Sequence, residues 1–163
     1  MVWWRELSIL IDTGVFYAFY NRLDIHHMDS ICLLTHIFEG RYGRPYTTDL
    51  VLSETYTLLR YRIGFNTAVG FLQILNKIDV KTIFLDSESY SETISILERY
   101  SDKKLSFTDA FLIYTLRNYG IEYIASYDER AFSGIASIIG RNYAKSLPKN
   151  EFNRILRLIK SLK

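Results

Sequence analysis

The fold is decided first by residues 7–21, LSILIDTGVFYAFYN. Its opening apolar run favours a buried strand, because Ile and neighbouring Leu side chains pack well on a sheet, and the run closes on Asp12. The aromatic stretch that follows, residues 15–21, has helical character. This pattern predicts a short strand over residues 7–12 that ends in an acid and leads directly into a helix.

The rest of the chain continues the alternation. Further strands are expected at 45–48, 80–85, 121–126 and 137–140. Longer helices are expected at 25–41 with Asp24 as its cap, 50–62, 66–78, from Ser87 to about 100, from Ser106 to Gly120, and after Pro148, with a short one near 127–134. Strands that alternate with helices form a mostly parallel sheet covered on both faces, so we predict an α/β fold.

Composition limits the class of protein. A chain of 163 residues with 48% apolar residues forms one compact globular domain. The single cysteine, Cys32, forms no internal disulfide, which indicates a reducing compartment and a cytoplasmic location. Charged residues interrupt every apolar run before it reaches membrane-spanning length, so no membrane association is expected.

Charge is distributed unevenly along the chain. The net charge of +2 is too small to indicate a partner, but the stretch from Lys145 onward carries +5 and the remainder −3. We therefore divide the chain into a domain over residues 1–146 and a basic amphipathic helix over residues 147–163.

Four acids are expected to converge at one edge of the sheet. Asp12 closes the first strand, and Asp128 follows the strand that ends at Ser126. Asp109 begins the helix that leads into that second strand, and Glu54 lies one turn into the helix after residues 45–48. Ligands in an open parallel sheet bind beyond the carboxyl ends of the strands.

Each acid also has a structural interpretation. Asp12 could cap the next helix, Asp128 could be an ordinary turn residue, and Asp109 has capping-box spacing with Ser106. Glu54 is the hardest to explain in this way, because no Lys or Arg lies three or four residues from it.

We expect Glu54 to point inward, on the face that carries Val51 and Leu58, and Asp109 to share an apolar face without a local cation. A buried acid without a cation is costly unless something neutralises it. A divalent cation would neutralise all four acids, and carboxylate ligands favour Mg²⁺ or Mn²⁺. Such an ion activates water and stabilises the leaving oxygen of a phosphodiester.

The same residues carry a resemblance to a known family. The segments IDTGVFYAF, LVLSETYTLL, SFTDAFLIYTL and IASYDERAF, in this order, resemble PIN-domain proteins, most closely the small VapC-type toxin nucleases and their free-standing relatives. The resemblance implies a three-layer α/β fold and metal-dependent cleavage of RNA by one or two Mg²⁺ or Mn²⁺ ions. It assigns Asp12, Glu54 and Asp109 as core ligands and Asp128 as a further ligand, with Thr13 and Ser126 as positioning hydroxyls.

The resemblance also implies partners. Many toxin relatives form homodimers and are silenced by an antitoxin whose tail fills the acidic groove. The basic helix after Pro148 is not part of the minimal family pattern. Its apolar stripe indicates docking onto the domain or a partner, and contact with RNA phosphates through Arg154, Arg157 and Lys160 is the second hypothesis.

Three other interpretations are weaker. Asp12-Thr13-Gly14 also spells the aspartic-protease signature, but no second copy is present. His26 and His27 lack a metal-ligand partner at helical spacing and are expected to be solvated or to cap a helix. The functional alternative to a nuclease is a PIN-fold scaffold that binds RNA or protein without cutting it.

Overall fold

The computed structural model describes residues 6–161 and contains one five-stranded parallel sheet. The strands are β1 (Ser8–Ile11), β2 (Arg44–Thr48), β3 (Lys81–Ile83), β4 (Tyr123–Ser126) and β5 (Ser137–Gly140), in the spatial order β3-β2-β1-β4-β5. All four strand pairings are parallel. The predicted α/β class is confirmed.

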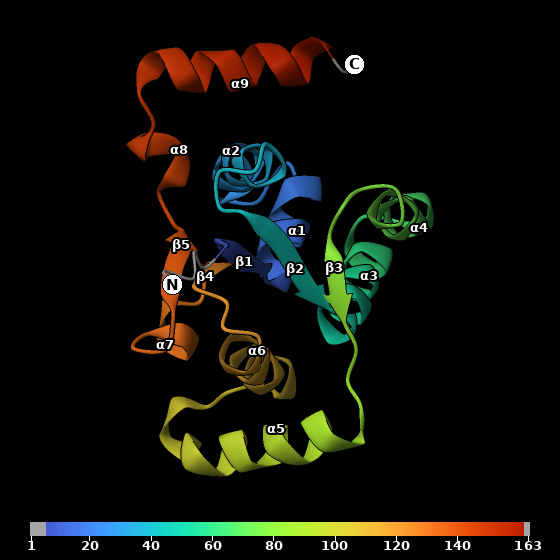
Figure 1. Ribbon diagram of the computed structural model, residues 1–163. Coiled ribbons are helices and arrows are strands. Elements are labelled where there is room, and N and C mark those ends of the chain that lie inside the picture. Colours follow the sequence, from blue (N-terminus) through green and yellow to red (C-terminus); the bar gives the residue numbers. More distant parts are fainter. Residues whose placement is uncertain (1–5, 162–163) are drawn as a thin grey trace.

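Helices cover both faces of this sheet. They are α1 (Thr13–Tyr20), α2 (His27–Phe38), α3 (Asp49–Arg62), α4 (Phe65–Leu75), α5 (Ser87–Arg99), α6 (Phe107–Asn118), α7 (Glu129–Phe132), α8 (Tyr143–Ser146) and α9 (Lys149–Ser161), with a 3₁₀ turn at Ser101–Lys103. In Figure 1, α1, α2 and α9 lie on one side of the strands and α5 and α6 on the other, which gives three layers. No helix within residues 6–161 is long and apolar enough to cross a membrane.

The sheet order places a switch point between β1 and β4. The chain first builds outward through β2 and β3, and then returns to the other side of β1 to add β4 and β5. Connections that run to opposite sides leave a crevice beyond the carboxyl ends of the two central strands. Because Ile11 pairs with Ala125, the residues that follow them, Asp12 and Ser126, meet at this crevice.

Two glycines permit close backbone contacts. A Cβ atom on Gly140 would lie 2.2 Å from the carbonyl oxygen of Ser126, so only glycine lets β5 approach β4 at this point. Gly43 has a φ of +73°, and a Cβ there would lie 1.8 Å from the carbonyl oxygen of Leu7.

Some predicted boundaries were wrong. The helix expected from residue 25 begins at His27, because the Asp24 carboxylate accepts the His26 backbone N–H at 2.8 Å and closes a turn instead of a helix cap. The cap of α5 is Asp86 and not Ser87, since the Asp86 side chain accepts the backbone N–H of Ser89 at 2.8 Å.

Two other elements are shorter than expected. The helix expected to reach residue 78 ends at Leu75 and is followed by turn residues, and the strand expected over residues 80–85 is reduced to the three residues of β3. Within residues 6–161, β3 is an edge strand that pairs with β2 alone, so its length is limited by the pairing that β2 offers.

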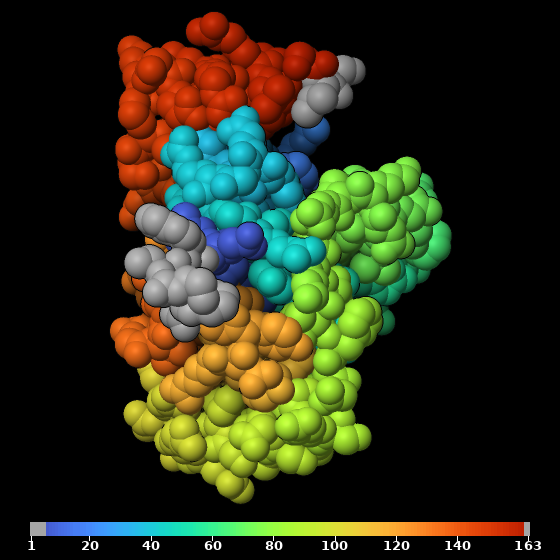
Figure 2. All heavy atoms as spheres, viewed as in Figure 1, coloured from blue at the N-terminus to red at the C-terminus, as the bar shows by residue number. Residues whose placement is uncertain are grey.

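The C-terminal helix α9 is anchored through a buried histidine. The His36 side chain is 0% exposed; its Nε2 lies 2.7 Å from Oε1 of Glu151, and its Nδ1 lies 2.7 Å from the Tyr143 hydroxyl. Arg154 donates to both oxygens of Glu39 at 2.8 Å and also pairs with Glu151. Ile155 of the same helix is fully buried. Figure 2 shows α9 lying across α2 as a result.

This network predicts a weakened attachment of α9 in Glu151→Gln. The bonds from Arg154 and His36 hold the pKa of Glu151 at about 2, below its ordinary value of 4.5. The carboxylate therefore stabilises the fold fully above pH 4.5, and this contribution is lost as the pH falls through about 2. We expect Glu151→Gln to melt several degrees below wild type at pH 7, with a smaller difference at pH 3.

The matched control is Glu98→Gln, a change to an exposed acid on α5 that has no described ion pair. It should melt like wild type. Equal melting temperatures for Glu151→Gln and Glu98→Gln at pH 7 would show that the network does not hold α9.

Candidate metal centre

Asp12 lies at the centre of the crevice between β1 and β4. It is 9% exposed, and its backbone N–H donates to the carbonyl oxygen of Ala125 at 3.0 Å. The side chain accepts the Thr13 backbone N–H at 2.7 Å through Oδ1 and the Ser126 hydroxyl at 2.7 Å through Oδ2. Asp12 thus caps α1, as the structural interpretation expected, and its carboxylate is also fixed against the end of β4.

The surroundings of Asp12 disfavour its charged form. Burial raises the pKa of its carboxyl from the ordinary 3.8 to about 7; the nearby charges of Asp109 and Glu54 act in the same direction, and the Ser126 hydrogen bond acts against them. An acid with such a pKa would be stabilised as the carboxylate by a bound cation.

Glu54 reaches the same place from α3. Its Oε2 accepts the Thr13 hydroxyl at 2.9 Å, so Thr13 links the end of β1 to α3. The prediction that Glu54 points inward is wrong, because its side chain is exposed. The buried face of α3 carries Val51, Thr55 and Leu59, and Glu54 lies beside that face.

Asp109 and Asp128 complete the acidic group. Asp109 is half-buried and forms the predicted capping box with Ser106, in which its Oδ2 accepts the Ser106 backbone N–H at 2.8 Å. Asp128 is exposed and caps α7 through Oδ1. The Asp128 backbone N–H donates to the Ser126 hydroxyl at 3.1 Å, so Ser126 connects Asp128 to Asp12.

The four acids have no cationic partner among the described residues. None of the ion pairs found within residues 6–161 involves Asp12, Glu54, Asp109 or Asp128. Three of them also keep one carboxylate oxygen that makes no hydrogen bond among the described residues, namely Oε1 of Glu54, Oδ1 of Asp109 and Oδ2 of Asp128. These oxygens fit a hard divalent cation, which takes carboxylate oxygens and waters as ligands.

A second cluster of residues that could bind a metal ion is already paired with an arginine. In the described chain, the only three potential ligands whose atoms all lie within 4.8 Å of one another are His36, Glu39 and Glu151. Arg154 already neutralises both of these carboxylates through paired hydrogen bonds, so an ion would have to displace a guanidinium. No three of the four acids at the crevice approach this closely, as expected for like charges.

The predicted nucleic-acid contacts on α9 divide into two groups. The guanidinium of Arg154 is occupied by Glu39 and Glu151. Arg157 and Lys160 are exposed and have no ion pair in the part of the chain that the structure describes, so their contact with RNA stays a prediction.

Sequence reasoning missed the residues that border the site on the β5 side. The Tyr127 ring stacks on the His26 ring with centroids 4.0 Å apart, and Arg141 donates from Nε to the Tyr127 carbonyl oxygen at 2.8 Å. Arg141 directly follows β5 and therefore lies at the same edge as Asp12. The sequence signal that could have placed Arg141 at this edge is its position directly after a short apolar strand.

Comparison with known proteins agrees with this geometry. The family model that matches the chain is the PIN domain, over residues 9–138. The chain belongs to the PIN-domain family. The chain is also similar to a VapC ribonuclease of Archaeoglobus fulgidus, with 36% identity over 159 residues that cover 94% of this chain and 96% of the relative.

Solved structures show the same architecture. VapC20 of Mycobacterium tuberculosis, described as a toxin that cleaves the sarcin–ricin loop, matches with a TM-score of 0.70 and 25% identity over 81% of this chain and 99% of its own. FitAcB of Neisseria gonorrhoeae matches with a TM-score of 0.56 and 13% identity, over 81% of this chain and 96% of its own. The predicted PIN-like fold is confirmed.

The raised pKa of Asp12 predicts the effect of Asp12→Asn on the metal-free protein. The folded state retains a proton between about pH 4 and 7 that the unfolded chain releases, so the wild type loses stability as the pH rises through this range. Asn removes this loss and can still accept the Thr13 N–H. We expect the free energy of unfolding of Asp12→Asn, relative to wild type, to increase by about 2 kcal/mol between pH 5 and pH 8.

The measurement is urea unfolding in EDTA at both pH values. Asp79→Asn, a change to an exposed acid without a described hydrogen bond, serves as the control and should follow wild type. A difference between Asp12→Asn and wild type that does not change with pH would contradict a raised pKa at Asp12.

Proposed function

We propose that this protein is a metal-dependent endoribonuclease whose metal is held by Asp12, Glu54, Asp109 and Asp128. The observation that carries the proposal is the buried Asp12 carboxylate, which shares the crevice with three acids and has no cationic partner among the described residues. Family membership and the similarity to a VapC ribonuclease support hydrolysis of RNA as the reaction. Family members depend on a metal ion; we propose Mg²⁺ or Mn²⁺ from the all-oxygen donor set.

Two hydroxyl side chains at the ends of the central strands orient three of the acids. Ser126 orients the Asp12 carboxylate and at the same time fixes the backbone of Asp128. Thr13 orients Glu54 through its hydroxyl and Asp12 through its backbone N–H. A bound divalent ion would supply an activated water and charge neutralisation at the phosphate. In its absence the four acids repel the phosphates beside the cleaved bond, so the metal strengthens the contact of the substrate with the acids as well as supplying the chemistry.

The proposed partners follow from the family. RNA is the substrate, and an antitoxin protein that blocks the acidic crevice is the proposed regulator of a VapC-type toxin. Homodimer formation and a cytoplasmic location are further proposals. An apolar groove between α1, α2, α4 and α9 supports a protein partner, because Phe19, Phe38 and Ile74 along it are exposed. Figure 2 shows the surface hollowed between α2 and α4.

The basic C-terminal helix is proposed as an addition to the nuclease domain. The division at residues 146 and 147 is supported by the family match, which ends at residue 138. The attachment of α9 to α2 through the His36 network agrees with the docking onto the domain that the apolar stripe of this helix predicts.

Cleavage of mixed cellular RNA with Mn²⁺ tests the proposal. We expect Asp12→Asn to reduce the cleavage rate at least about a hundredfold, because loss of a direct ligand exceeds the usual cost of losing an outer partner of a metal site. Asp79→Asn should cleave like wild type. Mapping of the cut ends separates specific from general cleavage.

Two outcomes would contradict the assignment. If Asp12→Asn cleaves as fast as wild type, the activity does not come from this site. If wild type binds RNA but does not cleave it with Mn²⁺ or Mg²⁺, the scaffold function is correct.

A further inference from the structure

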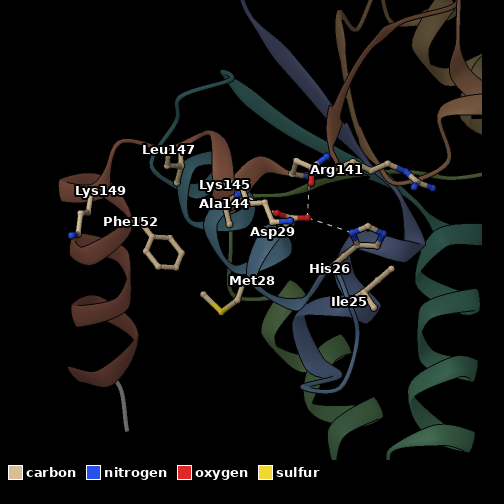
Figure 3. A pocket seen from close by; sticks show the side chains of 11 residues that line it. Ile25, His26, Met28, Asp29, Arg141, Ala144, Lys145, Leu147, Lys149 and Phe152 are labelled. Carbon is tan, nitrogen blue, oxygen red and sulfur yellow. Dashed lines mark hydrogen bonds and ion pairs between the residues drawn. The ribbon is translucent and has the colours of Figure 1, made fainter.

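A basic pocket adjoins the acidic crevice on the β5 side. It has a volume of about 620 Å³ and lies between the start of α2, the loop after β5, α8 and the start of α9. We define the basic pocket by Arg141, Lys145, Lys149, Asp29, His26 and Phe152, which are among its lining residues. Figure 3 shows His26 and Arg141 at one end of the pocket and Lys149 and Phe152 at the other.

One end of the pocket is joined to the proposed metal centre through Tyr127. This residue lies between Ser126 and Asp128 in the chain; its ring stacks on His26, and its carbonyl oxygen accepts the Arg141 Nε–H. This end of the pocket therefore lies beside the segment that carries Ser126 and Asp128. A polymer chain bound at the acids would enter the pocket from this end.

The pocket carries unneutralised positive charge. Lys145 and Lys149 are exposed and form no ion pair among the described residues, and the two terminal guanidinium nitrogens of Arg141 make no hydrogen bond there. Asp29 is the one acid among the described residues that line the wall. Its oxygens accept the backbone N–H groups of Asn142 and Ala144 at 3.1 and 2.9 Å, so its carboxylate is occupied in holding α8.

The pocket also offers apolar surface beside these charges. Phe152 of α9 and Met28 of α2 are half-buried on its wall, and Ile25 is 89% exposed at its edge. Cations that alternate with aromatic and apolar side chains match a single-stranded nucleic acid, whose phosphates pair with Lys and Arg and whose bases stack on rings. The carboxylates of an acidic protein tail would pair with the cations but would not stack on the ring.

We propose that the basic pocket binds the nucleotides of the RNA substrate that flank the cleaved bond. One phosphate pairs with Arg141 at the end near the acids, and further phosphates pair with Lys145 and Lys149. A base packs against Phe152 at the opposite end (Figure 3). This inference rests on the proposed function, and it assigns α8 and α9 a role in positioning the substrate. The acids and the basic pocket then act on neighbouring parts of one strand, one through the metal and the other through direct ion pairs.

Cleavage kinetics on a 5′-labelled single-stranded RNA test the inference. We expect Lys145→Gln/Lys149→Gln to raise KM about tenfold with kcat within about twofold of wild type, because the two lysines contact phosphate and not the reacting atoms. The slope of log(kcat/KM) against log[KCl] should become shallower by about 1.4, since each phosphate contact to a single strand contributes about 0.7. Phe152→Leu should raise KM without changing this slope.

The control carries the same change in charge elsewhere. Lys77→Gln/Arg99→Gln removes two exposed cations that follow α4 and end α5, outside the pocket. Its KM and salt slope should equal those of wild type, and both double variants should melt within about 2 °C of wild type, since surface changes of this kind alter stability little. Equal KM values for the two double variants would overturn the inference. A wild-type KM together with an unchanged salt slope for Lys145→Gln/Lys149→Gln would also overturn it.

A binding arm keeps this test separate from the proposed function. Fluorescence anisotropy with labelled RNA on the Asp12→Asn background in EDTA reports binding without metal-dependent cleavage. Weaker RNA binding after Lys145→Gln/Lys149→Gln, but not after the control change, supports the pocket even if no variant cleaves RNA. If cleavage depends on Asp12 while the pocket substitutions alter neither KM nor RNA binding, the inference fails and the proposed function stands. The inference also fails if Lys145→Gln/Lys149→Gln weakens the binding of an acidic peptide but not the binding of RNA.

Discussion

The structure depends on one hydrogen bond across the switch point of the sheet, from the Ser126 hydroxyl to the Asp12 carboxylate. It joins the ends of β1 and β4 at the crevice where the connections diverge. Both residues are buried there, so the pKa of Asp12 is raised to about 7 and its charged form is disfavoured without a cation. Two of the other acids are oriented from this pair, Glu54 through Thr13 and Asp128 through its backbone N–H to Ser126, whereas Asp109 is held by its capping box with Ser106.

The domain and the C-terminal stretch of the chain carry opposite net charges, which complements the acidic site. The acids lie on the domain, whereas the stretch from Lys145 onward is basic. The cations of this stretch have different roles. Arg154 forms ion pairs that hold α9 to α2. Lys145 and Lys149 line the basic pocket and have no ion pair among the described residues. An RNA strand that passes from the pocket to the acids would meet direct ion pairs first and the metal second.

The features that could be predicted from the sequence are those set by local periodicity. Apolar runs and caps determined the order of strands and helices, and a strand end followed by an acid located Asp12 and Asp128. The orientation of Glu54 could not be predicted from the sequence. The buried face of α3 runs through Thr55, and its neighbour Glu54 lies just outside this face. The pairing of Arg154 with Glu39 joins residues 115 positions apart, and the basic pocket is assembled from two distant segments, residues 25–29 and 141–152, so neither leaves a local pattern.

Anomalous X-ray diffraction from crystals grown with Mn²⁺ tests the central claim most directly, because it locates the ion itself. We predict a Mn²⁺ peak in the crevice between β1 and β4, with an Asp12 carboxylate oxygen and oxygens from at least two of Glu54, Asp109 and Asp128 within about 2.5 Å. A crevice without a peak at saturating Mn²⁺, or a peak only at the cluster of His36, Glu39 and Glu151, would contradict the account.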